Sequence, residues 1–410
     1  MKNSNIQWIG EIPDDWEVSK LKYIFDYIHR GQTPNYVEKS NCKVVNQSTF
    51  SKFFFDRDNQ KFTTDCRYND NFIRKKDVLM ASTGGGVLGK VFYYDLDYND
   101  SIADSHVTIL RATNKIESKF YYYTLSILFD WINNNLAEGS TNQTELQRDL
   151  LGNSFFPLPP LATQTSIATY LDAKCSEIDG LIADINKQIE TLNELKKSTI
   201  TEAVTKGLNK NAKLKDSGIQ WIGMIPEGWS KCRLKYLCEI TTGNEDTQNA
   251  DPDGEYPFYV RSPQVERCKR YTFDGEGILI AGDGAGAGRI FHHVFGKYAV
   301  HQRVYRLYNF KINTSYIHYY LSNIFPNEMD RGSAQSTVPS MRLPMLLNFN
   351  ILIPSESEQR DIATYLDTKC TEFDSIISDK QKQISTLEAY KKSLIYEYVT
   401  GKNLPPVIDN

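Results

Sequence analysis

Two copies of one unit make up this amino-acid sequence, and the repeat constrains the fold more than any other feature. Residues 6–24 (IQWIGEIPDDWEVSKLKYI) match residues 219–237 at 11 of 19 positions. Residues 167–205 match residues 362–400 at 24 of 39 positions, at an offset of 195. Self-similarity over such long stretches is the mark of a duplicated structural unit. The chain is therefore expected to fold as two copies of one architecture.

The distribution of the matches favours a functional difference between the copies. If maintenance of the fold were the only constraint, similarity would decay evenly along the unit. Instead, residues 25–166 and 238–361 share little beyond scattered glycines, while their flanks agree. We interpret this pattern as one scaffold that presents two different recognition surfaces. Even drift of a merely structural duplication is the alternative.

Composition narrows the class of protein. With 410 residues, 40% of them hydrophobic and 24% charged, the chain is long enough for two or more globular domains. It has no apolar run of about 18 residues that could span a bilayer, and its N-terminus lacks the pattern of a secretory signal. The 7 cysteines form no CxxC pair, and their odd number predicts free thiols in a reducing compartment. We expect a cytoplasmic protein.

The constant ends have the periodicity of long helices. Apolar residues step by alternating intervals of four and three, which is the a/d pattern of a coiled-coil seam. The second copy repeats the pattern with Lys380 in place of one apolar residue. The predicted seam residues are Leu171, Cys175, Ile178, Ile182, Ile185, Ile189, Leu192, Leu366, Cys370, Phe373, Ile377, Ile384 and Leu387.

Start and stop signals bound these helices. Prolines precede each helix, Ser355 and Glu358 have the spacing of a capping box, and Gly207 and Gly401 follow the last periodic residues. A helix of about 40 residues is ~60 Å long and must bury its seam against a partner. An intramolecular coiled coil between the two copies is the favoured arrangement. Two separate homodimer contacts are the alternative.

The variable middles have the pattern of β-rich domains. Short runs of aromatic and β-branched residues alternate with Asn, Asp and Gly, and an aromatic-rich helical segment follows in each copy (SKFYYYTLSILFDWINNN and TSYIHYYLSNIF). Core packing explains most of the 25 tyrosines, and a nucleic-acid surface is the alternative for some of them. Because the net charge is −4, such a surface would need local basic patches.

A glycine-rich loop in each middle is a candidate phosphate contact. Residues 84–90 (GGGVLGK) fit GxGxxG and the start of a P-loop, but Val91 stands where a P-loop has Ser or Thr. A dinucleotide site is disfavoured because a strand rather than a helix is expected after the loop. The second loop, residues 282–289 (GDGAGAGR), keeps the glycines without that spacing. We expect strand-to-strand loops whose amides and terminal cations, Lys90 and Arg289, approach a phosphate backbone. Simple glycine turns are the alternative.

Catalytic and metal-binding patterns are missing from the sequence. No Cys or His cluster has zinc spacing, and His292 and His293 form an isolated pair. No GxSxG nucleophile elbow is present, and residues 251–256 (DPDGEY) have the pattern of a turn rather than of a methyltransferase motif. The chain is therefore predicted not to be an enzyme, with no catalytic, cofactor-binding or metal-binding residues.

The phrases IQWIGEIPDDWEVSKLKYI and LPPLATQTSIATYLD, with their second copies, resemble those of type I restriction-modification specificity subunits over essentially the whole chain. The resemblance implies an α+β fold class: two pseudo-repeated β-rich target-recognition domains joined by two long antiparallel helices that form an intramolecular coiled coil. On this basis the target-recognition domains are expected at residues 1–156 and 213–353. The first spacer helix and linker would occupy residues 157–212, and the second spacer helix and C-terminal tail residues 354–410.

The resemblance also implies a function. The chain would be the sequence-specific DNA-recognition subunit of a complex that reads a bipartite double-stranded target, with one half-site per domain. Two modification subunits that use S-adenosylmethionine to methylate adenine would dock on the helices. Restriction subunits would add ATP- and Mg²⁺-dependent translocation and cleavage, while this chain would hold no cofactor and bind no membrane. Thr163 and Ser355-Glu356-Ser357 depart from the family pattern near the helix starts.

Two rival interpretations remain at this point. A restriction enzyme with a fused methyltransferase is disfavoured by the missing motifs. A coiled-coil scaffold that binds only protein partners is the other rival. Specific binding to duplex DNA in the presence of a methyltransferase partner would separate this scaffold from a recognition subunit.

Base recognition needs side chains that reach the groove edges, with Arg to guanine and Asn or Gln to adenine as common pairings. We therefore choose polar residues near the glycine loops and the flanking strands. A solvated surface position is the alternative for each. The predicted DNA-binding residues are Lys43, Gln47, Ser82, Thr83 and Lys90 in the first copy, and Arg261, Ser262, Arg289, Gln302 and Arg303 in the second.

Overall fold

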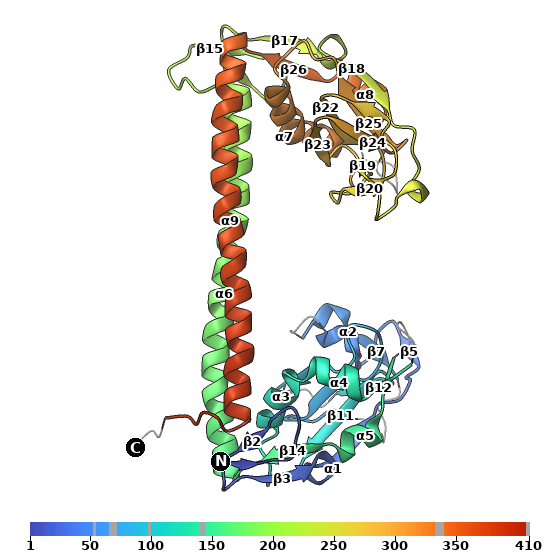
Figure 1. Cartoon of the computed structure of the whole chain (residues 1–410), viewed down its shortest axis with the longest axis vertical. Helices are drawn as coiled ribbons and strands as arrows, with labels where there is room; N and C mark the ends of the chain where they lie inside the picture. The colour runs from blue at the N-terminus through green and yellow to red at the C-terminus, as the bar shows by residue number, and fades with distance from the viewer. Residues whose placement is uncertain (52–54, 65–71, 97–99, 140–143, 333–339, 407–410) are drawn as a thin grey trace. The chain divides into compact units, whose positions relative to one another are not determined.

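The chain divides into two compact units in a computed structural model that describes residues 1–51, 55–64, 72–96, 100–139, 144–332 and 340–406 (Figure 1). Unit 1 comprises Met1–Asp184 and Gln383–Asn410, and unit 2 comprises Ile185–Lys382. Each unit holds one variable middle. Two long helices, α6 (Leu161–Lys206) and α9 (Glu356–Val399), contribute residues to both units.

Unit 1 is built on two four-stranded sheets. The first is antiparallel, in the order β4 (Phe25–Arg30), β11 (Val107–Ala112), β8 (Val78–Ala81) and β9 (Val91–Tyr93). The second has the order β10 (Ser101–Ala103), β6 (Cys42–Val45), β7 (Lys61–Thr63) and β5 (Tyr36–Val37), and its β10–β6 pair is parallel. All four residues of β8 are buried, as expected of a central strand covered on both faces.

Unit 2 repeats this arrangement, except that the fourth strand of its second sheet pairs at the opposite edge. Its antiparallel sheet has the order β18 (Glu239–Thr242), β25 (Val304–Tyr308), β22 (Gly277–Ala281) and β23 (Phe291–Val294). Its second sheet has the order β20 (Glu266–Cys268), β19 (Tyr256–Tyr259), β24 (Lys297–Val300) and β21 (Phe273–Asp274), and its β19–β24 pair is parallel. The two divergent sequences therefore share one β-rich framework, as predicted.

The aromatic-rich segments are helices, as the sequence predicted. They form α3 (Ser118–Ser126) and α4 (Phe129–Asn135) in unit 1 and α7 (Thr314–Gly332) in unit 2. Most of their tyrosines are buried, and Tyr121 and Tyr316 donate to the carbonyls of Pro157 and Leu352 at 3.0 Å. Core packing is thus confirmed for these tyrosines.

Shorter elements complete the two units. The pairs β3–β14 and β17–β26 lead from each start phrase to the strand before each long helix. The shorter elements are β1 (Lys2–Asn3), β2 (Glu11–Ile12), β3 (Glu17–Lys20), α1 (Leu21–Ile24), α2 (Gln47–Phe50), η1 (Arg57–Asn59), β12 (Ala137–Glu138), β13 (Glu145–Leu146), α5 (Arg148–Asn153), β14 (Phe155–Leu158), β15 (Leu214–Asp216), β16 (Met224–Pro226), β17 (Ser230–Arg233), η2 (Leu234–Tyr236), η3 (Thr247–Asn249), α8 (Leu343–Leu347) and β26 (Asn350–Ile353).

The long helices pair antiparallel within each unit. In unit 1, Tyr170 of α6 stacks on Tyr398 of α9 with ring centroids 4.6 Å apart. In unit 2, Lys380 of α9 donates to Gln188 of α6 at 2.5 Å, so the lysine that interrupts the apolar pattern finds a polar partner on the other helix. Every predicted seam residue is buried or half-buried. The intramolecular coiled coil is therefore confirmed.

In each unit, a tryptophan of the start phrase packs against the glycine that follows a long helix. Trp229 donates from its indole nitrogen to Glu358 of α9 at 2.9 Å, and a Cβ on Gly207 would lie 3.1 Å from the Trp229 ring. In unit 1 the equivalent Trp16 is fully buried, and a Cβ on Gly401 would lie 3.0 Å from its ring. Ser355 accepts from the amide of Glu358 at 3.3 Å, which confirms half of the predicted capping box.

Cysteine chemistry requires a correction. Cys175, Cys232, Cys238, Cys268 and Cys370 are free thiols, as predicted. Cys42, in contrast, is disulfide-bonded, and Cys66 lies outside the described residues. The odd number of cysteines could not exclude a single disulfide. Within the described parts of the chain, none of the helices combines the length and apolar character needed to cross a membrane.

Candidate nucleic-acid interface

The glycine-rich loops join antiparallel strands, β8 to β9 in unit 1 and β22 to β23 in unit 2. Gly84 and Gly284 have φ of +91° and +76°, in the left-handed region that favours glycine. Their carbonyls accept from the amides of Val87 and Ala287 at 3.2 and 3.0 Å, so the two loops turn in the same way. The expectation of strand-to-strand loops is confirmed, and no helix opens at either loop.

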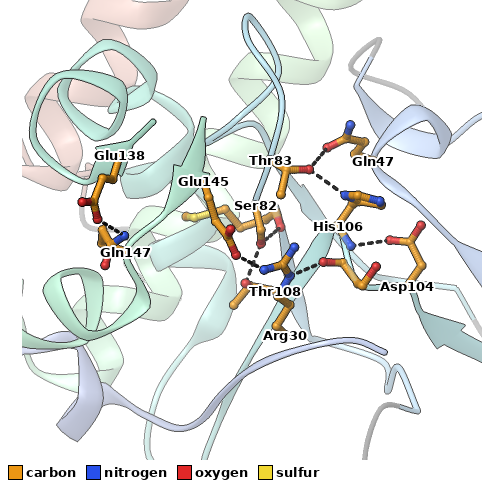
Figure 2. Close-up of polar contacts among 12 residues, drawn as sticks. Arg30, Gln47, Ser82, Thr83, Asp104, His106, Thr108, Glu138, Glu145 and Gln147 are labelled. Atoms are coloured by element: carbon orange, nitrogen blue, oxygen red, sulfur yellow. Dashed lines mark hydrogen bonds and ion pairs between the residues drawn. The ribbon is translucent and has the colours of Figure 1, made fainter. Parts of the chain in front are cut away.

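Three polar side chains from three segments meet at the first loop, and we call Gln47, Thr83 and His106 the first trio (Figure 2). The Thr83 hydroxyl donates to Gln47 Oε1 at 3.3 Å and lies 2.7 Å from His106 Nδ1. Gln47 begins α2, Thr83 follows β8, and His106 precedes β11. One hydroxyl therefore connects two side chains that are far apart in the sequence.

A charged counterpart occupies the second loop, and we call Arg261, Asp283 and Arg303 the second trio. Asp283 accepts from Arg261 Nη1 through Oδ1 and from Arg303 Nη1 through Oδ2, both at 2.9 Å. The Asp283 side chain is 16% exposed, whereas those of Arg261 and Arg303 are 41% and 63% exposed. A mostly covered carboxylate thus holds two guanidinium groups that face solvent.

Strand pairing places the two trios at equivalent positions. Gln47 and Arg261 each follow, by two residues, the last residue of β6 or β19 that pairs in parallel with the neighbouring strand. Thr83 and Asp283 each follow the end of β8 or β22 by two residues. Both form an isolated bridge, to Glu145 in unit 1 and to Ser340 in unit 2.

The third positions, His106 and Arg303, each stand one residue before β11 or β25. The amide of His106 donates to Asp104 Oδ1 at 2.8 Å, and the amide of Arg303 donates to His301 Nδ1 at 3.0 Å. Burial raises the pKa of Asp104. Burial and then the nearby Arg261 charge lower the pKa of His301, which favours the neutral ring that accepts this hydrogen bond.

Close backbone packing fixes the segments that lead into His106 and Arg303. A Cβ on Gly31, directly after β4, would overlap the carbonyl oxygens of Ala103 and Asp104, and a Cβ on Gly243, directly after β18, would overlap those of Val300 and His301. Glycine is therefore required at both positions by the approach of another backbone segment. The same close approach therefore holds the segment that precedes His106 in unit 1 and the segment that precedes Arg303 in unit 2.

Ser82 requires a correction as a candidate DNA contact. Its residue is 1% exposed, and its hydroxyl lies 2.6 Å from that of Thr108 in the sheet interior (Figure 2). In unit 2 the equivalent position is Gly282, where a Cβ would lie 3.1 Å from the Tyr305 ring. Ser82 beside Thr108 in unit 1 and Gly282 beside Tyr305 in unit 2 fill the same interior space with side chains of different size. Ser82 is therefore a core residue.

Lys90 and Arg289 end their loops but differ in position. The amide of Ala81 donates to the Lys90 carbonyl, whereas that of Ala281 donates to the Ile290 carbonyl, so Arg289 lies one residue earlier than Lys90 in the ladder. The Lys90 ammonium donates to the Ser51 carbonyl at 2.9 Å and is half-buried. Arg289 is exposed. Of these two predicted cations, only Arg289 presents an exposed side chain.

The remaining candidates lie beside the trios or apart from them. Gln302 precedes Arg303 and donates to Asp246 Oδ2 at 2.8 Å. Ser262 follows Arg261 and donates to the carbonyl of Gln264 within a local turn, at 3.0 Å. Lys43, on β6, forms an ion pair with Asp100 at 3.1 Å.

Sequence reasoning selected four of the six trio residues and missed His106 and Asp283. Asp283 lies inside the glycine loop, and its charge, opposite in sign to two chosen arginines, was the available signal. His106 is the first residue of the run HVTILRA, directly before β11, and only its place at the start of a strand could have pointed to it. Among the described residues, no group of three or more His, Cys, Asp or Glu side chains is placed to hold a metal ion.

Known proteins resemble this chain over its length. The type I restriction modification DNA specificity domain matches residues 13–191 and 226–386. Two specificity subunits of Methanocaldococcus jannaschii, those of the type I restriction enzymes MjaX and MjaVIII, are 29% and 26% identical. They cover 96% and 95% of this chain and 95% and 93% of their own lengths.

A structural comparison agrees on the fold. A chain solved in work on complex assembly and conformational transition of the type I R-M system has a TM-score of 0.71 and 16% identity, and the match covers 96% of this chain and 100% of that one. Two copies of the specificity domain, each on its β-rich framework with its share of the paired helices, account for the repeat. The chain belongs to the family of type I restriction-modification specificity subunits.

Proposed function

We propose that this chain reads a bipartite sequence in double-stranded DNA, one half-site per unit, and thereby directs adenine methylation and restriction by partner subunits. The observation that carries this proposal is the pair of trios at equivalent positions. The first offers an amide, a hydroxyl and an imidazole, and the second offers two guanidinium groups and a carboxylate. The same framework therefore supports two different recognition chemistries.

Base recognition and backbone contact would be divided between the trios and the loops. Arg pairs with the O6 and N7 of guanine, and Gln pairs with the N6 and N7 of adenine, so the trios match base edges. The glycine loops lie beside them and would place backbone amides, with the Arg289 charge, near phosphate oxygens. Because the net charge is −4, this local arrangement, not the global field, would attract DNA.

Each unit also offers an apolar pair on the outside of its helices for a modification subunit. Leu181 and Tyr390 are 48% and 55% exposed in unit 1, and Leu195 and Ile376 are 52% and 45% exposed in unit 2. Leu181 and Ile376 are related by the repeat, as are Leu195 and Tyr390. Contiguous exposed apolar surface marks protein contact sites, and we infer that each pair belongs to such a surface. Two equivalent pairs would suit two copies of one partner.

The chemistry of methylation and cleavage would reside in the partners. S-adenosylmethionine would bind the modification subunits, and ATP with Mg²⁺ would bind the restriction subunits. This chain would supply position. A scaffold that binds only proteins is not favoured, because both halves of the chain match the DNA specificity domain.

Exchange of one middle tests the proposal. Residues 25–156 would be replaced by the corresponding middle of another family member, and the complete system would be expressed in cells whose methylome is then sequenced. The exchange should alter one half of the methylated sequence and leave the other half and the spacing unchanged. Changes in both halves would contradict the assignment of one half-site to each unit.

Two controls accompany the exchange. Cells that carry the partner subunits without this chain should show no sequence-specific adenine methylation. The purified chain with labelled S-adenosylmethionine and duplex DNA should transfer no methyl group. Methyl transfer by the single chain would overturn its assignment as a recognition subunit.

A further inference from the structure

We propose that the central residue of each trio, Thr83 or Asp283, is a positioning residue that determines which base the flanking side chains recognise, and that the second trio selects guanine. This inference rests on the proposed function, since it assumes that the units read DNA. It adds a specific assignment: the chemistry of one central side chain, at one ladder position, sets the specificity of each unit.

The geometry of the second trio leaves both guanidinium groups available. Arg261 and Arg303 each use Nη1 to reach a different oxygen of Asp283. A guanidinium has five N–H donors, so one contact leaves a fork that can meet the O6 and N7 of guanine. Asp283 thus orients the two side chains without consuming their capacity to donate.

The charge of Asp283 favours contact with bases over contact with phosphates. An arginine pair intended for the DNA backbone gains nothing from a carboxylate between its members, because the carboxylate repels phosphate. At a groove edge the carboxylate is instead useful: it fixes the arginine geometry and rejects purine acceptor atoms that approach it directly. Limited exposure of Asp283, at 16% of its side chain, and high exposure of Arg303, at 63%, place the donors outermost.

The first trio has the same organisation with neutral chemistry. Thr83 bridges Gln47 and His106 as Asp283 bridges the two arginines, and all three side chains converge from separate segments (Figure 2). With Oε1 of Gln47 oriented by Thr83, the amide keeps its Nε2 donors for a purine N7. Oε1 retains a second lone pair for an adenine N6 donor. The first unit should therefore favour adenine where the second favours guanine.

A purely structural role makes a different prediction. If Asp283 only held the glycine loop to the segments that carry Arg261 and Arg303, its loss would lower the stability of the fold or weaken binding to every DNA sequence alike. A positioning residue instead changes the preference at particular bases. Conservative substitutions separate these roles, because they preserve shape while altering donors and acceptors.

The experiment uses the full-length chain assembled with its modification subunits and a library of duplex DNA with randomised sequence. The bound fraction is sequenced for wild type, Asp283→Asn, Arg303→Lys and Thr83→Val. Arg360→Lys is the matched control, since Arg360 forms an arginine–carboxylate pair with Glu356 within α9, at 2.6 Å, and belongs to neither trio. Thermal unfolding of each variant checks that the fold is retained.

We expect Asp283→Asn and Arg303→Lys to lower the preference for guanine about tenfold at one or two positions of one half-site. Thr83→Val should alter only the other half-site, and Arg360→Lys should alter neither. Arg303→Lys keeps the positive charge, so its effect reports the loss of the guanidinium fork even if Asp283→Asn fails to fold.

The failures are distinguishable. A wild-type chain that selects no sequence would overturn the proposed function and this inference with it. A wild-type chain that selects two half-sites, while Asp283→Asn and Arg303→Lys keep the same selection, would overturn the inference alone. Equal weakening across all sequences would also overturn it, because it would assign the trios to backbone contact.

Discussion

Lys391 donates from its ammonium to both carboxylate oxygens of Asp179, each at 2.7 Å. The repeat carries the same relationship in unit 2, where Lys196 donates to both oxygens of Asp374 at 2.7 and 2.8 Å. Each pair joins α6 to α9, with the roles of the two helices exchanged. The pairs therefore fix one antiparallel register for both units.

The first prediction concerns the energy of this pair. Because the side chains of Lys391 and Asp179 are 29% and 57% exposed, their coupling should be about 0.2–1 kcal/mol and should fall at high salt. A double-mutant cycle of Lys391→Met and Asp179→Asn, followed by urea unfolding, measures it. The pair of Lys382 with Asp379, within one helix and more exposed, is the control. A coupling of several kcal/mol would show that this register depends on the ion pair more than on the apolar seam.

The second prediction concerns the exposed apolar pairs. Leu181→Glu should remove one modification subunit from the assembled complex, and Ile376→Glu should remove the other, because each change places a charge in an apolar contact. Both positions are exposed, so the fold should tolerate them. The mass of the complex in solution reports the subunit number. Thr191→Glu, which adds the same charge at an exposed position of α6, is the matched control.

A complex that keeps two modification subunits with the Leu181→Glu and Ile376→Glu double variant would contradict this docking site. The loss of both subunits from either single variant would show that the two sites are coupled rather than independent.

The sequence predicted the framework well because its signals are local and repeated. The four-three spacing from Leu171 to Leu192 identified the coiled coil, and Gly207 and Gly401 marked the helix ends. The seam favoured pairing between the two copies, but the antiparallel direction came from the family resemblance, since an apolar stripe alone does not set the direction of the helix that covers it. The pairing of β6 with β10 in parallel also lay beyond the sequence, because it depends on contacts between distant segments.

The candidate site was predictable only in part. Arg261 and Arg303 were chosen for their chemistry, but nothing in their spacing revealed that both meet Asp283. Ser82 was chosen for its place beside the loop and is buried, since the burial of β8 continues one residue past the strand end. A polar residue near a loop can face inward or outward, and local sequence does not decide between them.

The third prediction concerns a buried ion pair in unit 1. Arg111 donates to both oxygens of Asp77 at 2.8 and 2.7 Å, and Asp77 is 1% exposed. Arg111→Met would leave the carboxylate buried without its cation, at a cost of about 3 kcal/mol in the free energy of unfolding. The double variant with Asp77→Asn should recover part of this loss. Urea unfolding of both variants tests the prediction, and a loss below about 1 kcal/mol would contradict it.

The pH dependence of this variant has a definite sign. Burial raises the pKa of Asp77, against the opposing effect of its hydrogen bond with Arg111. Without Arg111 the folded-state pKa should rise further, so the folded state binds a proton more readily than the unfolded state does. The destabilisation of Arg111→Met should therefore be largest at neutral pH and should shrink as the pH falls.

The fourth prediction concerns acid sensitivity of α7. Burial, and then repulsion from His293 and His292, lower the pKa of His318 to about 4. The His318 ring stacks on His293 with centroids 5.3 Å apart, and His293 contacts Glu276 at 2.9 Å. Because the folded-state pKa is depressed, the stability linked to neutral His318 is present above the ordinary pKa of 6.5 and is lost as the pH falls through about 4.

Hydrogen exchange of α7 measures this effect. After correction for intrinsic rates, the free energy of opening of α7 should decrease between pH 6.5, the ordinary pKa, and pH 4, the shifted one. The decrease should be at most about 3 kcal/mol. His318→Phe, which can stack but cannot titrate, should flatten the dependence. His29→Phe, at an exposed position of β4, should not. Equal acid sensitivity in wild type and His318→Phe would assign the loss of protection to another group.

The last prediction tests whether the paired helices set the distance between half-sites. Seven residues would be inserted after Leu192 in α6 and after Leu387 in α9, so that the heptad pattern continues in both helices. Because both helices gain the same length between the two ends of the coiled coil, Lys391 can still pair with Asp179 and Lys196 with Asp374. An insertion into α6 alone would mismatch them and is the control.

Seven helical residues rise ~10.5 Å, which corresponds to about three base pairs of B-DNA at 3.4 Å each. The double insertion should therefore lengthen the unread spacer in the methylated sequence by about three base pairs and leave the bases of both half-sites unchanged. Turning one half-site about the duplex axis by this amount should also lower efficiency, because both units must meet the same face of the DNA. Methylome sequencing reports both effects. A variant that methylates the original spacing with full efficiency would show that these helices do not set the distance.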